Sequence, residues 1–195
     1  MTGGYGAGMT DAGMTDIADR FRRLAAGFTA RVEAVPADRW SSPSPCEGWT
    51  ARDVVGHVAE GAGIFLGLVD RQPPEGPSAE DDPIGCWTVA RDAVQNGLDD
   101  PAVAGLEYEG DLGRKTFAEA VDRFYANDLM LHTWDLARAA GLDERLDPAE
   151  VHRVFQEMEP FDEMLRGSGS FGPRVDPPDG ADEQARLLAF VGRTV

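Results

Sequence analysis

Apolar residues recur at helical spacing in several separate segments of this chain, and this periodicity restricts the fold more than any other feature. The first segment predicts a helix from about Asp16 to Val35, with apolar positions at Ile17, Phe21, Leu24, Phe28 and Val32. Side chains three, four and seven residues apart lie on one face of a helix, so each segment offers one apolar face for packing. We therefore expect the core to lie between helices.

Start and stop residues give the bounds of the next two helices. Thr50 is a candidate N-cap for a second helix that reaches about Val69. Trp49 and Val54 flank this cap at the spacing of a hydrophobic staple. A polar, proline-containing break follows, and a third helix is expected at about 84–98.

The second half of the chain contains the longest predicted helix. It begins after Thr116, where Glu119 completes a capping box, and it ends at Gly141, a residue that favours the left-handed conformation of a helix stop. Asp147 and the proline after it begin a fifth helix that is expected to end near Arg166.

Shorter pieces complete the prediction of an all-α domain with a four-helix core, one additional short helix and loops. The stretch 101–115 has little helical character and predicts a short extended piece or a long crossover. The segment 181–193 predicts the short closing helix. Residues 1–15 are glycine-rich without an apolar period, so we expect them to be disordered and 16–195 to form one domain. Met9 and Met14 are both candidate start residues.

The charge and the composition disfavour several classes of function. The chain has 35 acidic and 18 basic residues, a net charge of −17, and such a surface repels nucleic acids and anionic membranes. No apolar run approaches the roughly 18 residues of a membrane span, and no secretory signal is recognisable. The cysteines are Cys46 and Cys86 alone, which fits a reducing compartment. A cytoplasmic location is expected.

Two polar side chains interrupt the apolar face of the longest predicted helix. Asp128 and His132 are four residues apart and hence lie side by side on that face. The same face contains Phe117, Val121, Phe124, Tyr125, Leu131, Asp135 and Ala139. A buried carboxylate is costly unless it is paired, protonated or bound to a metal ion. The pair therefore predicts either a structural hydrogen bond or two metal ligands.

The second helix contributes a third candidate ligand, His57. It shares the predicted inward face with Val54, Gly61, Ile64 and Leu68. Gly61, one turn further on, removes a side chain that would crowd a site, and Asp53 lies one turn earlier at the edge of the face. Two histidines and one carboxylate from facing helices form a three-ligand set with an open position, which is typical of catalytic metal sites.

Other polar residues near these positions have alternative roles. Each inward histidine could instead be a core residue with a satisfied hydrogen bond. Asp135 could accept a hydrogen bond from a ligand imidazole, or it could make an ordinary bond between helices. His152 is interpreted mainly as structural, and Cys46 as a small buried residue or a pocket thiol.

Two motifs carry a resemblance to a known family. "PSPCEGWTARDVVGHVAEG" (43–61) followed by "DLMLHTWDLARAAG" (128–141) resembles the DinB-like metal-binding superfamily. Within it, the sequence is similar to the mycothiol-dependent maleylpyruvate isomerase N-terminal type. The closing "ARLLAFVGR" (185–193) resembles the ends of small actinobacterial members, so the similarity covers the chain from Asp16 onward.

The resemblance implies a DinB-like four-helix bundle that holds a divalent metal ion. Carried onto this sequence, its ligands are His57, Asp128 and His132. Zn²⁺ is the expected ion, and Ni²⁺ or another transition metal also fits. The isomerase type has a Glu where Asp128 stands, and the shorter Asp would hold the ion closer to the helix or less tightly. The isomerase also has a C-terminal substrate-binding part, which we do not expect in this chain.

The sequence thus favours a metal-dependent enzyme that uses a low-molecular-weight thiol, a transferase or isomerase with mycothiol as the expected thiol. Its partners would be the thiol and an electrophilic substrate, and the resemblance suggests a homodimer. The alternatives are a non-catalytic stress-response or binding protein with a structural metal ion, and a metal-assisted hydrolase with a water nucleophile.

Overall fold

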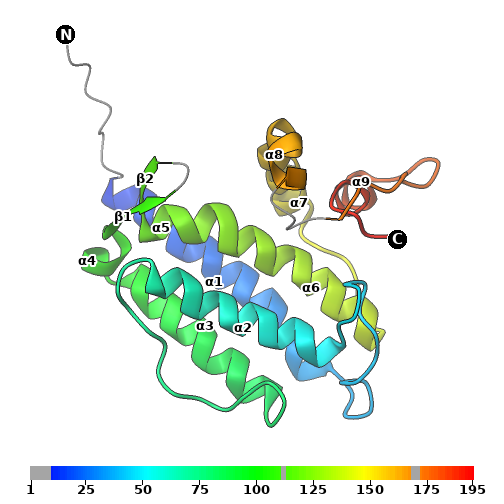
Figure 1. Cartoon of the computed structure of the whole chain (residues 1–195), viewed down its shortest axis with the longest axis horizontal. Coiled ribbons are helices and arrows are strands. Elements are labelled where there is room, and N and C mark those ends of the chain that lie inside the picture. Colours follow the sequence, from blue (N-terminus) through cyan, green and yellow to red (C-terminus); the bar gives the residue numbers. More distant parts are fainter. Residues whose placement is uncertain (1–9, 111–112, 168–171) are drawn as a thin grey trace. The chain divides into compact units, whose positions relative to one another are not determined.

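The computed structural model describes residues 10–110, 113–167 and 172–195, and these residues are mainly helical (Figure 1). The α-helices are α1 (Asp11–Ala34), α2 (Ala51–Gly67), α3 (Pro83–Asp99), α4 (Pro101–Ala104), α5 (Phe117–Ala120), α6 (Ala126–Ala140), α7 (Pro148–Met158), α8 (Asp162–Gly167) and α9 (Glu183–Phe190). Strands β1 (Glu107–Gly110) and β2 (Gly113–Thr116) pair antiparallel. The predicted all-α fold is confirmed. None of the described helices combines the length and the apolar character needed to cross a membrane.

The chain divides into two compact units. The first comprises Met1–Glu33 and Val55–Leu129, and the second comprises Ala34–Val54 and Met130–Val195. Helices α1, α2 and α6 contribute residues to both units because the division falls within each of them.

The first unit contains the predicted four-helix arrangement, formed by α1, α2, α3 and the stretch from α5 to the start of α6 (Figure 1). Between α1 and α3, the indole of Trp87 donates to the Thr29 hydroxyl at 2.8 Å and packs edge-on against Phe28. Between α3 and α5, the ring of Phe117 lies so close to Gly97 that a Cβ there would approach it within 2.9 Å. Apolar side chains therefore pack between α1 and α3 and between α3 and α5.

Helix α1 begins at Asp11, five residues before the predicted start. The hydroxyl of Thr10 accepts from the Gly13 amide at 3.3 Å, which is the bond expected of an N-cap. The segment 1–15 was predicted to be disordered; residues 1–9 lie outside the described part, whereas 11–15 are helical. A threonine cap extends the helix beyond its first apolar residue.

The helix starts predicted from capping residues are confirmed. The Asp53 amide donates to the Thr50 hydroxyl at 3.3 Å at the start of α2. Thr116 and Glu119 form a reciprocal capping box at the start of α5. Gly141, which follows α6, has a φ of 71°, as expected of a left-handed stop.

The longest predicted helix is composite. Its residues Val121–Tyr125 form a π-helical turn, here called the π-turn, between α5 and α6. In the π-turn the Ala126 amide donates to the Val121 carbonyl, five residues earlier. Apolar periodicity did not reveal this turn.

The second unit contains α7, α8 and α9. Asp147 caps α7 as predicted, but the helix ends at Met158 and does not continue to Arg166. A 3₁₀ turn, Glu159–Phe161, separates it from α8, because Pro160 lacks an amide proton and its ring obstructs the preceding turn. Helix α9 packs on α7 through the rings of Phe155 and Phe190, whose centroids are 5.6 Å apart.

Candidate metal centre

The first unit brings His57 of α2 together with Asp128 of α6. His57 Nε2 lies 3.3 Å from Asp128 Oδ2. Two ligands about 2.0–2.1 Å from a tetrahedral ion would themselves be separated by roughly 3.3 Å, so the pair fits that donor geometry. The two side chains are 40% and 37% exposed, so Asp128 is not the buried carboxylate that periodicity predicted.

The predicted inward face of α2 also needs correction. Ile64 is 67% exposed and Leu68 is exposed as well. Val54 is buried as predicted, and the rest of the buried face consists of Ala51, Val55, Val58, Ala62 and Leu66. Because His57 lies beside this face and not in its centre, it is accessible to solvent. Gly61 has a different role from the predicted one, since a Cβ there would approach the Tyr125 ring within 3.0 Å.

The second unit places His132 in a buried environment with a hydrogen-bond partner and a stacked ring. His132 is 4% exposed, and its Nδ1 lies 2.9 Å from Oδ2 of Asp135. The indole of Trp49 stacks on the imidazole with a centroid separation of 5.8 Å. A hydrogen bond from Nδ1–H to the carboxylate leaves Nε2 with its lone pair, the form in which a histidine binds metal.

Asp135 is completely buried and is surrounded by donors. Arg193 donates to it from Nε at 3.3 Å and from Nη2 at 2.9 Å, and the Cys46 thiol donates at 3.4 Å. Burial alone would raise the pKa of Asp135, but the hydrogen bonds from His132 and Arg193 outweigh it and lower the pKa below its usual range. Asp135 is therefore a carboxylate that holds the His132 ring.

Cys46, His132 and Asp135 present ligand atoms within 4.8 Å of one another and resemble a second metal cluster. Arg193 argues against that role, because its Nη2 lies 3.7 Å from Cys46 Sγ and 2.9 Å from Asp135. A fixed guanidinium repels a cation at this position. We interpret the group as a hydrogen-bonded support for His132.

Asp128 and His132 are one turn apart on α6, as predicted, but the division between the two units falls between them. The structure therefore describes the His57–Asp128 pair and the environment of His132 each by itself. The complete three-ligand set stays a prediction.

The remaining candidates have other partners. Asp53 accepts from the Thr50 amide and hydroxyl at 2.8 and 2.6 Å, and these bonds lower its pKa. His152 is exposed, and its Nδ1 lies 2.9 Å from Glu183. Both side chains therefore serve local structure.

Sequence reasoning missed Arg193 and the stacking role of Trp49. Gly192 precedes Arg193 with a φ of 87°, and a Cβ there would lie 2.9 Å from the Pro173 carbonyl oxygen. A Gly-Arg pair directly after a helix was the available signal, since glycine at this position turns the chain sharply.

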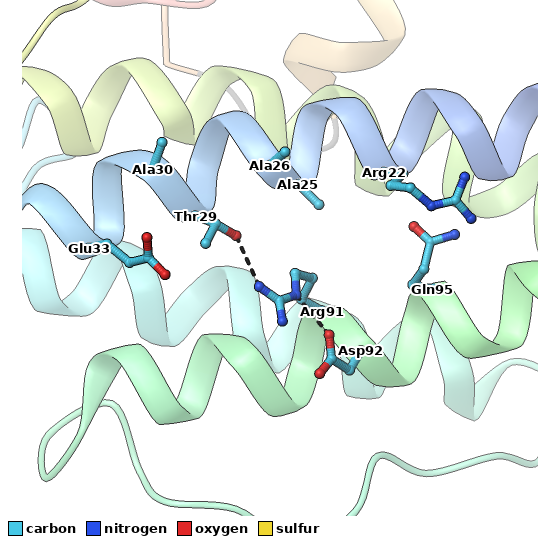
Figure 2. Close-up of a pocket in the computed structure, with 9 residues that line it drawn as sticks. All are labelled: Arg22, Ala25, Ala26, Thr29, Ala30, Glu33, Arg91, Asp92 and Gln95. Carbon is cyan, nitrogen blue, oxygen red and sulfur yellow. Dashed lines mark hydrogen bonds and ion pairs between the residues drawn. The ribbon is translucent and has the colours of Figure 1, made fainter.

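A groove of about 400 Å³ lies between α1 and α3 in the first unit (Figure 2). Alanines of α1 line it, and Arg91 of α3 contacts Thr29 and Asp92 at its edge. The described residues that line this groove include none of the predicted ligands, so it is separate from the His57–Asp128 pair.

The helical bundle of the first unit and its imidazole–carboxylate pair define the class, an all-α protein of DinB-like fold with a candidate metal centre. The chain belongs to the family of the mycothiol maleylpyruvate isomerase N-terminal domain, whose model matches residues 21–93. This membership places it among mycothiol-related, DinB-like metal-binding proteins.

Two relatives come from strains of Mycobacterium tuberculosis. They are "Uncharacterized protein MT0763" of strain CDC 1551 / Oshkosh and "Uncharacterized protein Rv0738" of strain ATCC 25618 / H37Rv. Each is 30% identical over 181 residues, which cover 89% of this chain and 96% of the relative. No solved structure matches the chain.

Proposed function

We propose that the protein is a metal-dependent enzyme of the thiol-transferase or isomerase kind, with a divalent ion held by His57, Asp128 and His132. The observation that carries this proposal is the His57–Asp128 pair, 3.3 Å apart and half-exposed, in a chain of this family. Zn²⁺ is the expected ion, because imidazole and carboxylate are among its usual ligands; Ni²⁺ or another transition metal also suits them.

The residues of the chain would bind the ion and keep one side of it accessible. The exposed faces of His57 and Asp128 leave room for small molecules from solvent. Asp135 accepts from His132 Nδ1 and so would leave Nε2 as the nitrogen available to bind the ion. A bound divalent ion supplies a Lewis acid that lowers the pKa of a thiol and makes its thiolate available at neutral pH.

Membership of this family makes mycothiol the expected thiol, and its thiolate would react with an electrophilic substrate. The partner proposed is accordingly a small molecule and not a nucleic acid, whose phosphates the net charge of −17 repels.

Metal content tests the ligand set. Protein purified without added metal should contain a near-stoichiometric divalent ion by elemental analysis. Single alanine variants of His57, Asp128 and His132 should lose most of it, because each removes one of three ligands. His152→Ala is the matched control and should retain the ion, since His152 contacts Glu183. Equal loss in all four variants, or no ion in the unaltered protein, would contradict the proposal.

Cobalt substitution tests the thiol. Adding mycothiol to the Co²⁺ protein should produce a sulfur-to-cobalt charge-transfer band, and His57→Ala should abolish it. Cys46→Ala should keep the band, because Cys46 donates to Asp135 and is not assigned as a ligand. A band that precedes thiol addition and disappears in Cys46→Ala would make Cys46 a ligand. That result would favour the non-catalytic alternative, a protein with a structural metal ion that stabilises the packing of its helices.

A further inference from the structure

Arg20 of α1 is a buried cation in the first unit, with only 1% of its surface exposed. A guanidinium is rarely buried unless several acceptors surround it. Arg20 Nη1 donates to the Asp122 carbonyl at 2.7 Å and to Asp122 Oδ1 at 2.9 Å, and Nη2 donates to Asn127 Oδ1 at 2.9 Å. All of these acceptors belong to the π-turn or to the first residues of α6.

The π-turn depends on such donors because its wider winding disturbs the regular pairing of helix carbonyls. The Asp122 carbonyl accepts from Arg20, and the next carbonyl, that of Arg123, accepts from Asn127 Nδ2 at 2.9 Å. Since Arg20 also binds Asn127, the guanidinium and the amide together satisfy two successive carbonyls of the π-turn.

The π-turn also contacts the helix that contains His57. Tyr125, its last residue, donates from its hydroxyl to the Val58 carbonyl at 2.8 Å. The ring of Tyr125 lies against Gly61, one helical turn after His57. The position of the π-turn is therefore linked to the turn of α2 that includes His57.

A π-turn contains one residue more than the α-helical turn that it replaces, so it changes which residue of α6 faces α2. Helix α5 is fixed by the buried Phe117 ring against Gly97. If α5 continued into α6 without the π-turn, Asn127 would occupy the position beside His57, and Asp128 would be rotated away by about 100°. An amide would then replace a carboxylate at the metal centre.

We infer that Arg20 is a positioning residue for the metal centre: it maintains the π-turn and thereby keeps Asp128 opposite His57. This inference rests on the proposed function, because it assigns Arg20 a role toward the ion that Asp128 is proposed to bind. Arg20 does not touch the ion; it acts through the winding of the helix. A guanidinium that only filled the core would stabilise the fold without determining metal affinity.

Replacement of Arg20 tests this role. Arg20→Met keeps an unbranched side chain and removes its hydrogen-bond donors. Co²⁺ affinity, measured by titration, should fall at least about tenfold, as it does when residues that orient metal ligands are replaced. Arg22→Met is the control on the same helix, since Arg22 is exposed and pairs with Asp99, and its Co²⁺ affinity should be unchanged. Unchanged affinity in a folded Arg20→Met protein would overturn the inference. If the unaltered protein binds no Co²⁺, the proposed function itself fails.

A deletion separates positioning from general destabilisation. Removing Arg123, an exposed residue of the π-turn, from the Arg20→Met protein takes out the additional residue, so a regular helix would bring Asp128 back beside His57. Co²⁺ affinity should then recover toward that of the unaltered protein, and failure to recover would overturn the inference.

If the Arg20→Met protein does not fold, Asn127→Ala is the variant to test. This substitution removes one acceptor of Arg20 and the amide that donates to the Arg123 carbonyl. Its Co²⁺ affinity should fall, and unchanged affinity would again overturn the inference.

Discussion

At the scale of single residues, two aspartates of α6 have different environments and hence different roles. Asp128 is half-exposed and lies 3.3 Å from the His57 imidazole, as a ligand of an accessible ion would. Asp135 is fully buried and accepts from His132, Arg193 and Cys46. The Asp135 carboxylate is thus engaged by three donor side chains and holds the His132 ring in place.

Asp135→Asn should weaken the metal centre and the fold together. The amide removes the charge that pairs with Arg193 and can present an N–H to His132 Nδ1, which disfavours the required tautomer. We expect Co²⁺ affinity to fall about 10–100-fold. We also expect the free energy of unfolding of the metal-free protein to fall by about 3–5 kcal/mol, the usual cost of breaking a buried ion pair.

Titration with Co²⁺ and urea denaturation without metal measure these two effects separately. Asp143→Asn is the matched control, because Asp143 is half-exposed and pairs at the surface with Arg145, two residues away. It should change neither quantity appreciably. If Asp135→Asn leaves both unchanged, Asp135 does not support His132.

At the scale of elements, the sequence predicted the capped starts of α2, α5 and α7 well because capping is local. Thr50, Thr116 and Asp147 each bond to amides two or three residues away, so a short window contains the whole interaction. The end of α7 was also open to prediction, since Pro160 lies within the expected helix and has no amide proton to donate. The π-turn was not predictable in this way, because its Asp122 carbonyl accepts from Arg20, about a hundred residues earlier in the chain.

For the candidate site, the sequence predicted the approach of His57 and Asp128 but not the exposure of these side chains. Periodicity selected His57, Asp128 and His132, and the first two do approach each other. It placed Asp128 in the core because a helical wheel assumes 100° per residue throughout, whereas the π-turn changes the phase before α6. It also treated Ile64 and Leu68 as buried because they are apolar, although α2 exposes both.

The turn after α9 offers a prediction at this scale. Gly192 and Gly180 both have positive φ, 87° and 75°, but only Gly192 lies against backbone, at the Pro173 carbonyl. Gly180→Ala should cost about 1–2 kcal/mol of unfolding free energy from the left-handed conformation alone. Gly192→Ala should cost more, because the new Cβ also displaces the segment that positions Arg193 at Asp135.

Urea denaturation compares the two alanine variants directly, and Co²⁺ titration adds a second comparison. Only Gly192→Ala should reduce Co²⁺ affinity, since only that turn precedes the partner of Asp135. Equal stability losses with equal Co²⁺ affinities would show that the Gly192 turn has no part in the metal centre.

At the scale of the whole molecule, the net charge of −17 affects how metal binding must be measured. An acidic surface concentrates cations near the protein whether or not a specific site exists. Such binding is screened by salt over a Debye length of about 8 Å at physiological ionic strength, whereas ligation by two imidazoles and a carboxylate is not. A specific ion should therefore remain bound at ionic strengths that displace the diffuse ones.

Chelation should consequently lower the melting temperature of the protein by an amount that salt does not abolish. An ion present at about 100 times its Kd stabilises the folded state by about 2.7 kcal/mol, provided that the unfolded chain does not bind it. For a chain of this size each kcal/mol shifts the melting temperature by about 2–4 °C, so EDTA should lower it by about 5–10 °C. Calorimetry in about 0.3 M salt, roughly twice physiological ionic strength, measures this difference. Asp128→Ala should melt at the same temperature with and without EDTA, because its ligand set is incomplete.

A second control compares ions after chelation. Addition of Zn²⁺ should restore the melting temperature and addition of Mg²⁺ should not, since Mg²⁺ prefers oxygen ligands in octahedral geometry. If the effect of EDTA disappears in high salt, or if Mg²⁺ reverses it as well as Zn²⁺ does, the stabilisation comes from diffusely bound cations. Either result would contradict a specific metal centre.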